Sequence, residues 1–288
     1  MRVRFKPVSQ ASAVRPPAVA GQFYPADPEE LRTQVKGFLT AAKPAMAGTP
    51  KAIIAPHAGY RYSGPIAGSA YACLARGRDR FQRVVLLGPS HFVAFDGLAA
   101  SNAAVFQSPL GSIPVDEEAL ARARALPQVT TLEAAHRDEH SLEVQLPFLQ
   151  IALGEFKLVP LVVGDTTAED VGCVLNELWD GDETCIVISS DLSHYHDYAT
   201  AQQIDRETAG IIESLNWENL DGDRACGCQP IGGLLWAAKA RGLHCRTVDL
   251  RNSGDASGGH DRVVGYGAFV LTEDRTRRRE SIPSQQPT

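Results

Sequence analysis

The sequence predicts an α/β fold: a single domain with a mostly parallel central sheet flanked by helices. Short apolar runs, rich in Val and Ile, alternate along the chain with stretches of helical periodicity, which is typical of successive βαβ units. The runs are apolar on both faces, as expected for parallel strands that helices cover. Because the 288 residues contain neither an internal repeat nor a clear linker, we expect a single domain over residues 15–275.

Local signals place the elements of the first half of the chain. Asp27 followed by Pro28 predicts the start of a helix, because Asp caps helix N-termini and Pro suits the first helical position. The expected order is a flexible terminus at 1–14, an ordered extended segment at 15–25, a helix from Asp27 to about Thr40, a strand from Ala52, a helix from Pro65 to Leu74, a strand at 83–88, and short strands or a lid-like insertion at 92–115.

The second half continues the alternation. Gly242 predicts the end of a helix, since glycine readily adopts the left-handed conformation at that position. Residues 276–288, charged and then rich in Ser, Pro and Gln, predict a disordered tail. The expected helices are at 116–126, from His140, at 168–178, at 199–215 and at 231–241, and the expected strands at 157–163, from Ile186, at 246–250 and at 263–272.

Three of the predicted strands are followed by a histidine. The apolar runs that begin at residues 52, 84 and 186 lead to His57, His91 and His194. Because the carboxyl ends of parallel strands meet at one edge of a sheet, where ligands bind in such folds, we expect these imidazoles to share a cleft. Imidazole is both the commonest metal ligand and the usual acid–base group near neutral pH. The sequence therefore predicts a metal site or a histidine-driven active site.

A metal bound by His57 and His91 needs at least one further protein ligand. Cys226 is favoured because a helix is predicted to begin near Pro230, and the dipole at a helix N-terminus favours the thiolate. Ordinary thiols in a loop, or a reversible disulfide between Cys226 and Cys228, are the alternatives. The other residues that could complete the set are His194, His140, Glu143 and Asp191.

Two further pairs of residues are suited to the same cleft. Asp191 precedes His194 by three residues, so its carboxylate could orient the imidazole as an acid–base or supporting group. His140 and Glu143 are also three residues apart and would share one face of a helix. A cluster of charges at a helix terminus explains His140 and Glu143 equally well.

Composition restricts the partners that we expect. A net charge of −6 and a pI near 5.8 argue against nucleic-acid binding. No apolar run approaches the roughly 20 residues of a membrane span, and the first residues contain no apolar signal core, so a cytoplasmic protein is expected. The six cysteines are expected to be thiols, with Cys73, Cys173 and Cys185 in the core. Gly-x-Ser-x-Gly, Walker A and Gly-x-Gly-x-x-Gly motifs are missing from the sequence.

Five motifs in order resemble the Memo family, whose prokaryotic members are called AmmeMemoRadiSam system protein B. The resemblance runs from about Arg15 to Thr272 and includes the N-terminal Arg15-Pro16-Pro17-Ala18-Val19-Ala20-Gly21. The motifs are Ala55-Pro56-His57-Ala58-Gly59-Tyr60, Leu87-Gly88-Pro89-Ser90-His91, Glu139-His140-Ser141-Leu142-Glu143, Ser189-Ser190-Asp191-Leu192-Ser193-His194, and Cys226-Gly227 followed by Pro230-Ile231.

The resemblance implies a fold similar to the class III extradiol dioxygenases, which are non-haem iron enzymes. It implies a pocket that binds one iron or copper ion through His57, His91 and Cys226, with Asp191 and His194 in the same pocket. It also implies association with a radical-SAM protein and an AMMECR1-like protein.

Two functions therefore remain open. The first is iron- or copper-dependent redox chemistry on a small substrate, with His194 and Asp191 as catalytic groups and with His140 and Glu143 lining the pocket. The thiolate of Cys226 replaces the carboxylate of the dioxygenases and favours copper(I) or a redox role. The second is a non-catalytic protein that binds a metal or a partner within the radical-SAM system. Recognition of an anionic peptide group by the histidines, without a metal, is a further alternative.

Overall fold

The computed structural model describes residues 14–43 and 48–273. The predicted tail at 276–288 and residues 1–13 of the predicted flexible terminus lie outside these ranges. Val14 and Arg15 form a short strand, so Val14 is ordered, contrary to the expectation for residues 1–14. The described strands are β1 (Val14–Arg15), β2 (Ala52–Ala55), β3 (Arg83–Pro89), β4 (Leu98–Ala100), β5 (Val105–Ser108), β6 (Gly111–Pro114), β7 (Val129–Thr131), β8 (Lys157–Val163), β9 (Thr184–Ser189), β10 (His194–His196), β11 (Leu243–Asn252) and β12 (Val263–Glu273).

The larger sheet is mixed, with parallel strands at its centre. Its order is β10-β12-β2-β9-β3-β8-β4-β7, with β11 on β12, and the pairs β2–β9, β9–β3 and β3–β8 are parallel. Antiparallel pairings of β12 with β2 and of β4 with β8 continue the sheet on both sides. A second sheet, β1-β5-β6, attaches the start of the described chain to the β5–β6 hairpin. The predicted α/β fold with helices around a central sheet is confirmed.

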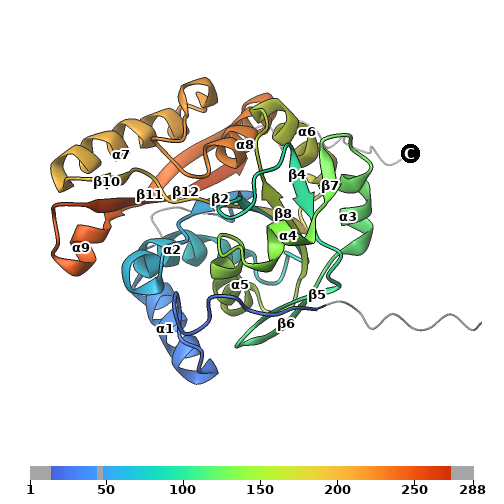
Figure 1. Cartoon of the computed structure of the whole chain (residues 1–288), viewed down its shortest axis with the longest axis horizontal. Helices are drawn as coiled ribbons and strands as arrows, with labels where there is room; N and C mark the ends of the chain where they lie inside the picture. The colour runs from blue at the N-terminus through green and yellow to red at the C-terminus, as the bar shows by residue number, and fades with distance from the viewer. Residues whose placement is uncertain (1–13, 44–47, 274–288) are drawn as a thin grey trace, which may run out of the picture.

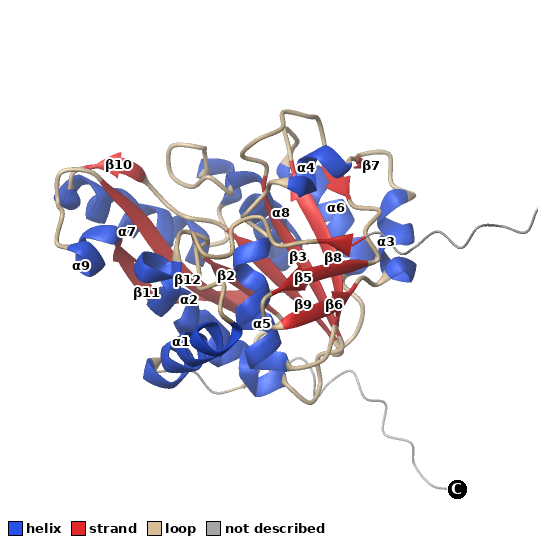
Figure 2. Cartoon of the chain, turned by 60° about the horizontal axis from the view of Figure 1, so that its bottom comes forward, coloured by secondary structure: helices blue, strands red, loops and turns tan. Residues whose placement is uncertain are grey.

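Helices cover both faces of the sheet. Figure 1 shows α1, α2 and α5 on one face and α6, α7 and α8 on the other, and Figure 2 turns the first group toward the viewer. The described helices are α1 (Pro28–Ala41), α2 (Tyr60–Leu74), α3 (Glu117–Arg124), α4 (Glu133–Arg137), α5 (Leu146–Leu153), α6 (Ala168–Leu178), α7 (Tyr198–Glu213), α8 (Cys228–Arg241) and α9 (Ser253–Ser257), with short 3-10 turns at Ala75–Gly77, Glu143–Gln145 and Trp217–Asn219.

The order of the strands creates a place where the direction of winding reverses. The chain passes from β2 through α2 to β3, and later from β8 through α6 to β9, which lies between β2 and β3. Right-handed crossovers in opposite directions place α2 and α6 on opposite faces. The loop that follows β2 and the loop that follows β8 therefore leave the sheet toward opposite faces. The gap between diverging loops is where α/β sheets commonly bind ligands.

Local sequence signals explain most element boundaries. The Asp27 side chain accepts hydrogen bonds from the backbone N–H groups of Glu29 and Glu30, and Gly242 ends α8 in the left-handed conformation, both as predicted. The helix expected from Pro65 begins earlier, at Tyr60. Pro65 therefore lies inside α2, beyond its first turn, where it removes one backbone hydrogen bond and disfavours a straight helix.

The core forms one cluster, built from the central strands and the inward faces of the helices. Cys73 and Cys185 are buried, whereas Cys173 is exposed on α6, so the prediction for Cys173 is wrong. An apolar neighbourhood in the sequence did not place Cys173 on the inner face, because only the residues at helical spacing from Val171 and Val174 point inward. In the described ranges, none of the helices is both long and apolar enough to cross a bilayer.

Two glycine substitutions test the helix packing. A Cβ on Gly172 of α6 would lie 2.3 Å from Trp236 Cε3 of α8, whereas a Cβ on Gly210 of α7 meets no atom within 4 Å. Gly172→Ala is expected to lower the free energy of unfolding by about 1–3 kcal/mol through overpacking. Gly210→Ala is expected to raise it by roughly 0.5–1 kcal/mol through helix propensity. Urea unfolding of both variants measures these changes, and stabilisation by Gly172→Ala would contradict the tight α6–α8 contact.

Candidate metal centre

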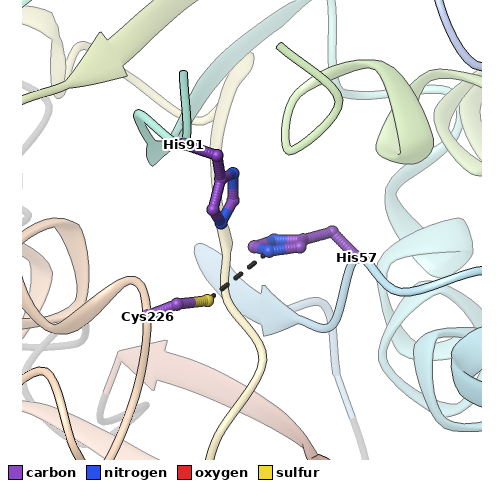
Figure 3. A group of neighbouring side chains, drawn as sticks. All are labelled: His57, His91 and Cys226. Atoms are coloured by element: carbon purple, nitrogen blue, oxygen red, sulfur yellow. Dashed lines mark hydrogen bonds between the residues drawn. The ribbon is translucent and has the colours of Figure 1, made fainter. Parts of the chain in front are cut away.

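Three side chains converge at the carboxyl edge of the central strands. His57 follows β2 and His91 follows β3, and β9 lies between these two strands. Figure 3 shows both imidazoles and the thiol of Cys226 pointing toward one common region. The ring centroids of His57 and His91 are 5.2 Å apart, and the donor atoms of all three residues lie within 4.8 Å of one another. The structure thus brings together the three residues that the sequence analysis singles out as ligands.

Cys226 reaches this edge because glycine follows it. The Gly227 N–H donates to Ser190 Oγ at 2.9 Å, and a Cβ on Gly227 would lie 2.7 Å from the Ser190 side chain. Only glycine allows the start of α8 to approach the end of β9 this closely. The Cys226 Sγ lies 3.5 Å from His57 Nε2 as a result, the contact drawn in Figure 3.

The hydrogen bonds of His57 determine which ring nitrogen carries the proton. His57 Nδ1 lies 2.9 Å from Ser189 Oγ, which donates its own proton to the carbonyl oxygen of Ser141 at 2.6 Å. Ser189 Oγ must therefore accept from Nδ1–H, which leaves a lone pair on Nε2 facing the thiol. Burial, and to a lesser degree the neighbouring imidazoles, lower the pKa of His57, so this ring is neutral.

Glu139 fixes the His91 ring in the same way. His91 Nδ1 lies 2.8 Å from Glu139 Oε1, and the backbone N–H groups of His91 and Ser141 also donate to this carboxylate. Despite its burial, these hydrogen bonds and the nearby imidazole lower the pKa of Glu139 to about 2. An ionised carboxylate only accepts, so Nδ1 of His91 donates to Glu139 and Nε2 is the ring nitrogen left to bind a metal. A carboxylate behind a histidine is the usual support of a metal ligand.

His140 completes the group of imidazoles. Its ring stacks on His91 with centroids 4.6 Å apart, lies 5.6 Å from the His57 ring, and its Nδ1 is 3.6 Å from Glu139 Oε1. Burial lowers the pKa of His140. His140 therefore lies at the site as a neutral ring, while the segment that carries it is irregular rather than the helix expected to begin there.

The donor set is suited to a transition-metal ion. A tetrahedral ion with bonds of about 2.1 Å to nitrogen and about 2.3 Å to sulfur separates its donors by about 3.6 Å. The distance of 3.5 Å between Cys226 Sγ and His57 Nε2 agrees with that spacing. Since the Nδ1 atoms of His57 and His91 both bind protein acceptors, Nε2 is the nitrogen that each ring offers to a cation, and the thiol would lose its proton when the cation binds.

The thiol of Cys226 corrects one expectation. The sequence predicts that the start of α8 lowers its pKa, yet burial, helped by the Asp191 carboxylate, raises the pKa to about 12. The partial charge of a helix N-terminus is small compared with the cost of burying an anion away from water. In the metal-free chain Cys226 is a neutral thiol, and Cys226 and Cys228 are both free.

Asp191 and His194 are near the site but do not form the predicted pair. Asp191 Oδ1 accepts from the backbone N–H of His57 at 2.7 Å and of Ala58 at 3.3 Å. The ring of His194 instead donates to the backbone of Leu192, and burial lowers its pKa. After β9 the chain directs the Asp191 carboxylate toward the loop that follows β2. Asp191 therefore fixes the backbone of His57, a candidate ligand.

Glu143 lies apart from the histidines. It is fully buried, and its carboxylate accepts from Arg15, from the backbone N–H groups of Ala18 and Val19, and from the Tyr24 hydroxyl. His140 and Glu143 do not share a helix face, since the helical turn begins only at Glu143. The contacts of Glu143 are thus with the N-terminal segment of the chain.

Three supporting residues escaped the sequence analysis. Glu139 and Ser189 fix the two imidazoles, and Gln145 Nε2 donates to Ser189 Oγ at 2.8 Å. Glu139 and Ser189 lie within the sequence motifs that resemble the Memo family. That position in the motifs is the sequence signal that could have identified them. Their roles depend on contacts between residues 44 to 132 positions apart, which residue spacing cannot indicate.

A cavity of about 530 Å³ opens beside the thiol. The loop after β3, the end of β8 and the start of α8 form its walls. Ser90, Phe95, Asp165 and Gln229 are among its lining residues, and Cys226 lies on its wall. The cavity is large enough for a small molecule next to the convergent donors.

A buried carboxylate below the β9–β10 loop gives a pH-dependent prediction. Asp205 of α7 is 2% exposed and accepts from the Ser193 N–H, and burial raises its pKa from 3.8 to about 6. Because the folded chain holds this proton more tightly than the unfolded chain, the stability that it contributes is complete below about pH 3.8 and is lost as the pH rises through about 6.

Asp205→Asn removes this titration. The variant is therefore expected to gain stability relative to wild type by up to ~3 kcal/mol between about pH 4 and pH 7.5. Urea unfolding of both proteins at these two pH values measures the change. A difference in stability that does not depend on pH would show that folding does not raise the pKa of Asp205.

The Memo-like protein family model matches residues 15–270. The chain belongs to the Memo family. It is 36% identical over 283 residues to a MEMO1 family protein of Methanopyrus kandleri, covering 89% of this chain and 98% of that protein. It is 38% identical over 269 residues to one of Aquifex aeolicus, covering 90% and 99%.

Among solved structures, this Memo-family chain is similar in fold to an uncharacterised protein from Escherichia coli K12. The TM-score is 0.53 at 15% identity, with 77% of this chain and all of that chain covered. The predicted family is confirmed. The more specific likeness to class III extradiol dioxygenases stays a prediction.

Proposed function

We propose that this Memo-family protein binds one iron or copper ion through His57, His91 and Cys226 and uses it for redox chemistry on a small substrate. The observation that carries the proposal is the hydrogen bonding of the two imidazoles. Ser189 and Glu139 bind the Nδ1 atoms of the two imidazoles, His57 Nε2 lies 3.5 Å from the thiol sulfur, and the donor atoms of His57, His91 and Cys226 lie within 4.8 Å of one another. Such an arrangement prepares a cation site before any cation arrives.

The donor chemistry favours these two metals. Imidazole is a suitable ligand for iron, copper and zinc, and a thiolate selects softer ions such as copper(I). When bound, such an ion would supply electron transfer and positions for a substrate.

The chain itself would contribute positioning, shielding and a proton-transfer group. Buried His57 and Asp191 limit the access of water from the side of the sheet, and the cavity beside Cys226 offers space for the substrate. His194, whose pKa is lowered by burial, would accept a proton as a neutral imidazole and return it as the imidazolium.

A non-catalytic role in a radical-SAM-associated system is the alternative. One observation favours it: Phe92 and Tyr195, next in sequence to His91 and His194, are 62% and 63% exposed. Exposed aromatic side chains at the rim of a site are suited to contact with a protein or peptide partner. On this alternative the metal would bind without turnover, and the rim would bind the partner.

Metal analysis of protein purified without oxygen or chelators tests the proposal. We expect close to one iron or copper per chain in the wild type and a strong loss in His57→Ala, His91→Ala and Cys226→Ala. His260→Ala, at an exposed histidine that stacks on Tyr198, is the control and should retain the metal. A wild-type protein that binds neither metal after anaerobic reconstitution would refute the metal site and would turn attention to metal-free recognition by the histidines.

A further inference from the structure

A buried arginine connects the N-terminal segment to the loop behind the candidate metal ligands. Arg15 is 4% exposed, and its guanidinium donates to three acceptors on residues 136–143. Nε donates to the carbonyl of His136 at 3.1 Å, Nη2 to the carbonyl of Glu139 at 2.6 Å, and Nη1 to the carboxylate of Glu143. One rigid group thus fixes the start, middle and end of this segment.

The segment depends on such contacts because residues 138–142 lie between helical elements and form no helix or strand of their own. Ser141 anchors one side by donating from its hydroxyl to the carbonyl of Pro89 at 2.9 Å. Arg15 anchors the other side, directly at the backbone of Glu139. The carboxylate of Glu139 is the group that fixes the ring of His91.

Glu143 fixes the N-terminal segment in turn. Its carboxylate accepts from the N–H groups of Ala18 and Val19 at 2.7 and 2.9 Å and from the Tyr24 hydroxyl at 2.5 Å. Further along this segment, the ring of Phe23 lies 4.7 Å from that of His140. The Phe23 carbonyl accepts from the N–H of Tyr60, three residues after His57. The segment therefore contacts the loop that carries His140 and the start of α2, just after His57.

We propose that Arg15 and Glu143 are positioning residues, which hold Glu139 so that the His91 ring presents its Nε2 to the metal. Residues 15–24 therefore fix the geometry of the site in addition to completing the fold. This inference rests on the proposed metal site for its consequence in binding. The orientation of the His91 ring itself does not require a metal.

Two substitutions and one matched control test this proposal on the full chain. Arg15→Lys keeps the positive charge but lacks the planar guanidinium that donates to three acceptors. Glu143→Gln keeps the shape of the side chain but removes its negative charge. Arg83→Lys is the control, since Arg83 also bridges two carboxylates, Asp116 and Asp180, at the opposite end of β3. Each variant is measured at a temperature where circular dichroism shows that it is folded. If one of the two variants does not fold, the other still tests the proposal.

The first measurement is the dissociation constant for cobalt(II), which serves as the probe metal. We expect affinity to fall by about 10–100-fold in Arg15→Lys and Glu143→Gln, the usual effect of disturbing the support of a ligand. Arg83→Lys should stay within about threefold of wild type. Folded variants of Arg15 and Glu143 with wild-type affinity would overturn the positioning role.

The second measurement uses nitrogen-15 spectra of the imidazoles in the metal-free protein. We expect His91 to be a single tautomer protonated on Nδ1 in the wild type and in Arg83→Lys, and a mixture of tautomers in Arg15→Lys and Glu143→Gln. An unchanged single tautomer in both would refute the proposal. If His57→Ala retains wild-type cobalt affinity, the metal site fails, and these spectra still decide the role of Arg15 and Glu143.

Discussion

Replacing Glu143 by leucine is expected to lower the free energy of unfolding by about 3–5 kcal/mol, because it leaves a guanidinium buried without its partner. Arg15 and Glu143 are 4% and 0% exposed, so water cannot replace the lost carboxylate. The substitution also leaves the N–H groups of Ala18 and Val19 and the Tyr24 hydroxyl without an acceptor. Urea unfolding near neutral pH measures the loss.

A double variant separates the contribution of the charge. Arg15→Met with Glu143→Leu removes both charges and is expected to be more stable than Glu143→Leu alone, since apolar pairs often replace buried ion pairs at little cost. A loss of less than about 1 kcal/mol in the single variant would show that Glu143 does not fix the N-terminal segment.

Replacing Cys226 by serine is expected to lower the affinity for copper(I) or iron(II) by more than about 100-fold, which exceeds the effect of removing a supporting group. A hydroxyl has the shape of the thiol but is a poor ligand for a soft cation. Cys228, two residues away at the start of α8, provides the matched control. Cys228→Ser should change the affinity by less than about threefold.

Anaerobic titration with a competing chelator measures both affinities. Equal losses in Cys226→Ser and Cys228→Ser would indicate a site that uses both thiols or a general disturbance of the loop. If both variants keep the wild-type affinity, sulfur is not a ligand. The third ligand would then be His140 or another residue of the pocket.

Periodicity and the residues at strand ends predicted much of this fold. The strand at Lys157–Val163 and the helix at Ala168–Leu178 have the predicted boundaries, because apolar runs and capping residues are local signals. The approach of His57 to His91 followed from one topological rule about parallel strands. Each of these predictions needed only the neighbours of a residue in sequence and the general architecture.

The contacts that orient the site depended on long-range packing. Asp191 precedes His194 by three residues, yet its carboxylate turns to the backbone of His57, which is 134 residues away. Likewise Glu143 was expected beside His140 but lies with Arg15, 128 residues earlier. Buried polar groups accept whichever donors the fold brings to them, so their partners depend on the packed structure and not on sequence spacing.

The environment of Cys226 shows a similar limit. A helix start nearby is visible in the sequence, but the burial that raises the thiol pKa is not. Burial here depends on Gly227, which lets the loop lie against Ser190. The sequence showed the glycine but not the strand end that it contacts.

X-ray absorption at the metal edge of the reconstituted protein tests whether His57, His91 and Cys226 bind the metal. We expect one sulfur neighbour at about 2.3 Å and nitrogen neighbours near 2.0–2.1 Å, with the sulfur signal absent in Cys226→Ser. A metal surrounded only by nitrogen and oxygen in the wild type would contradict a centre built from His57, His91 and Cys226.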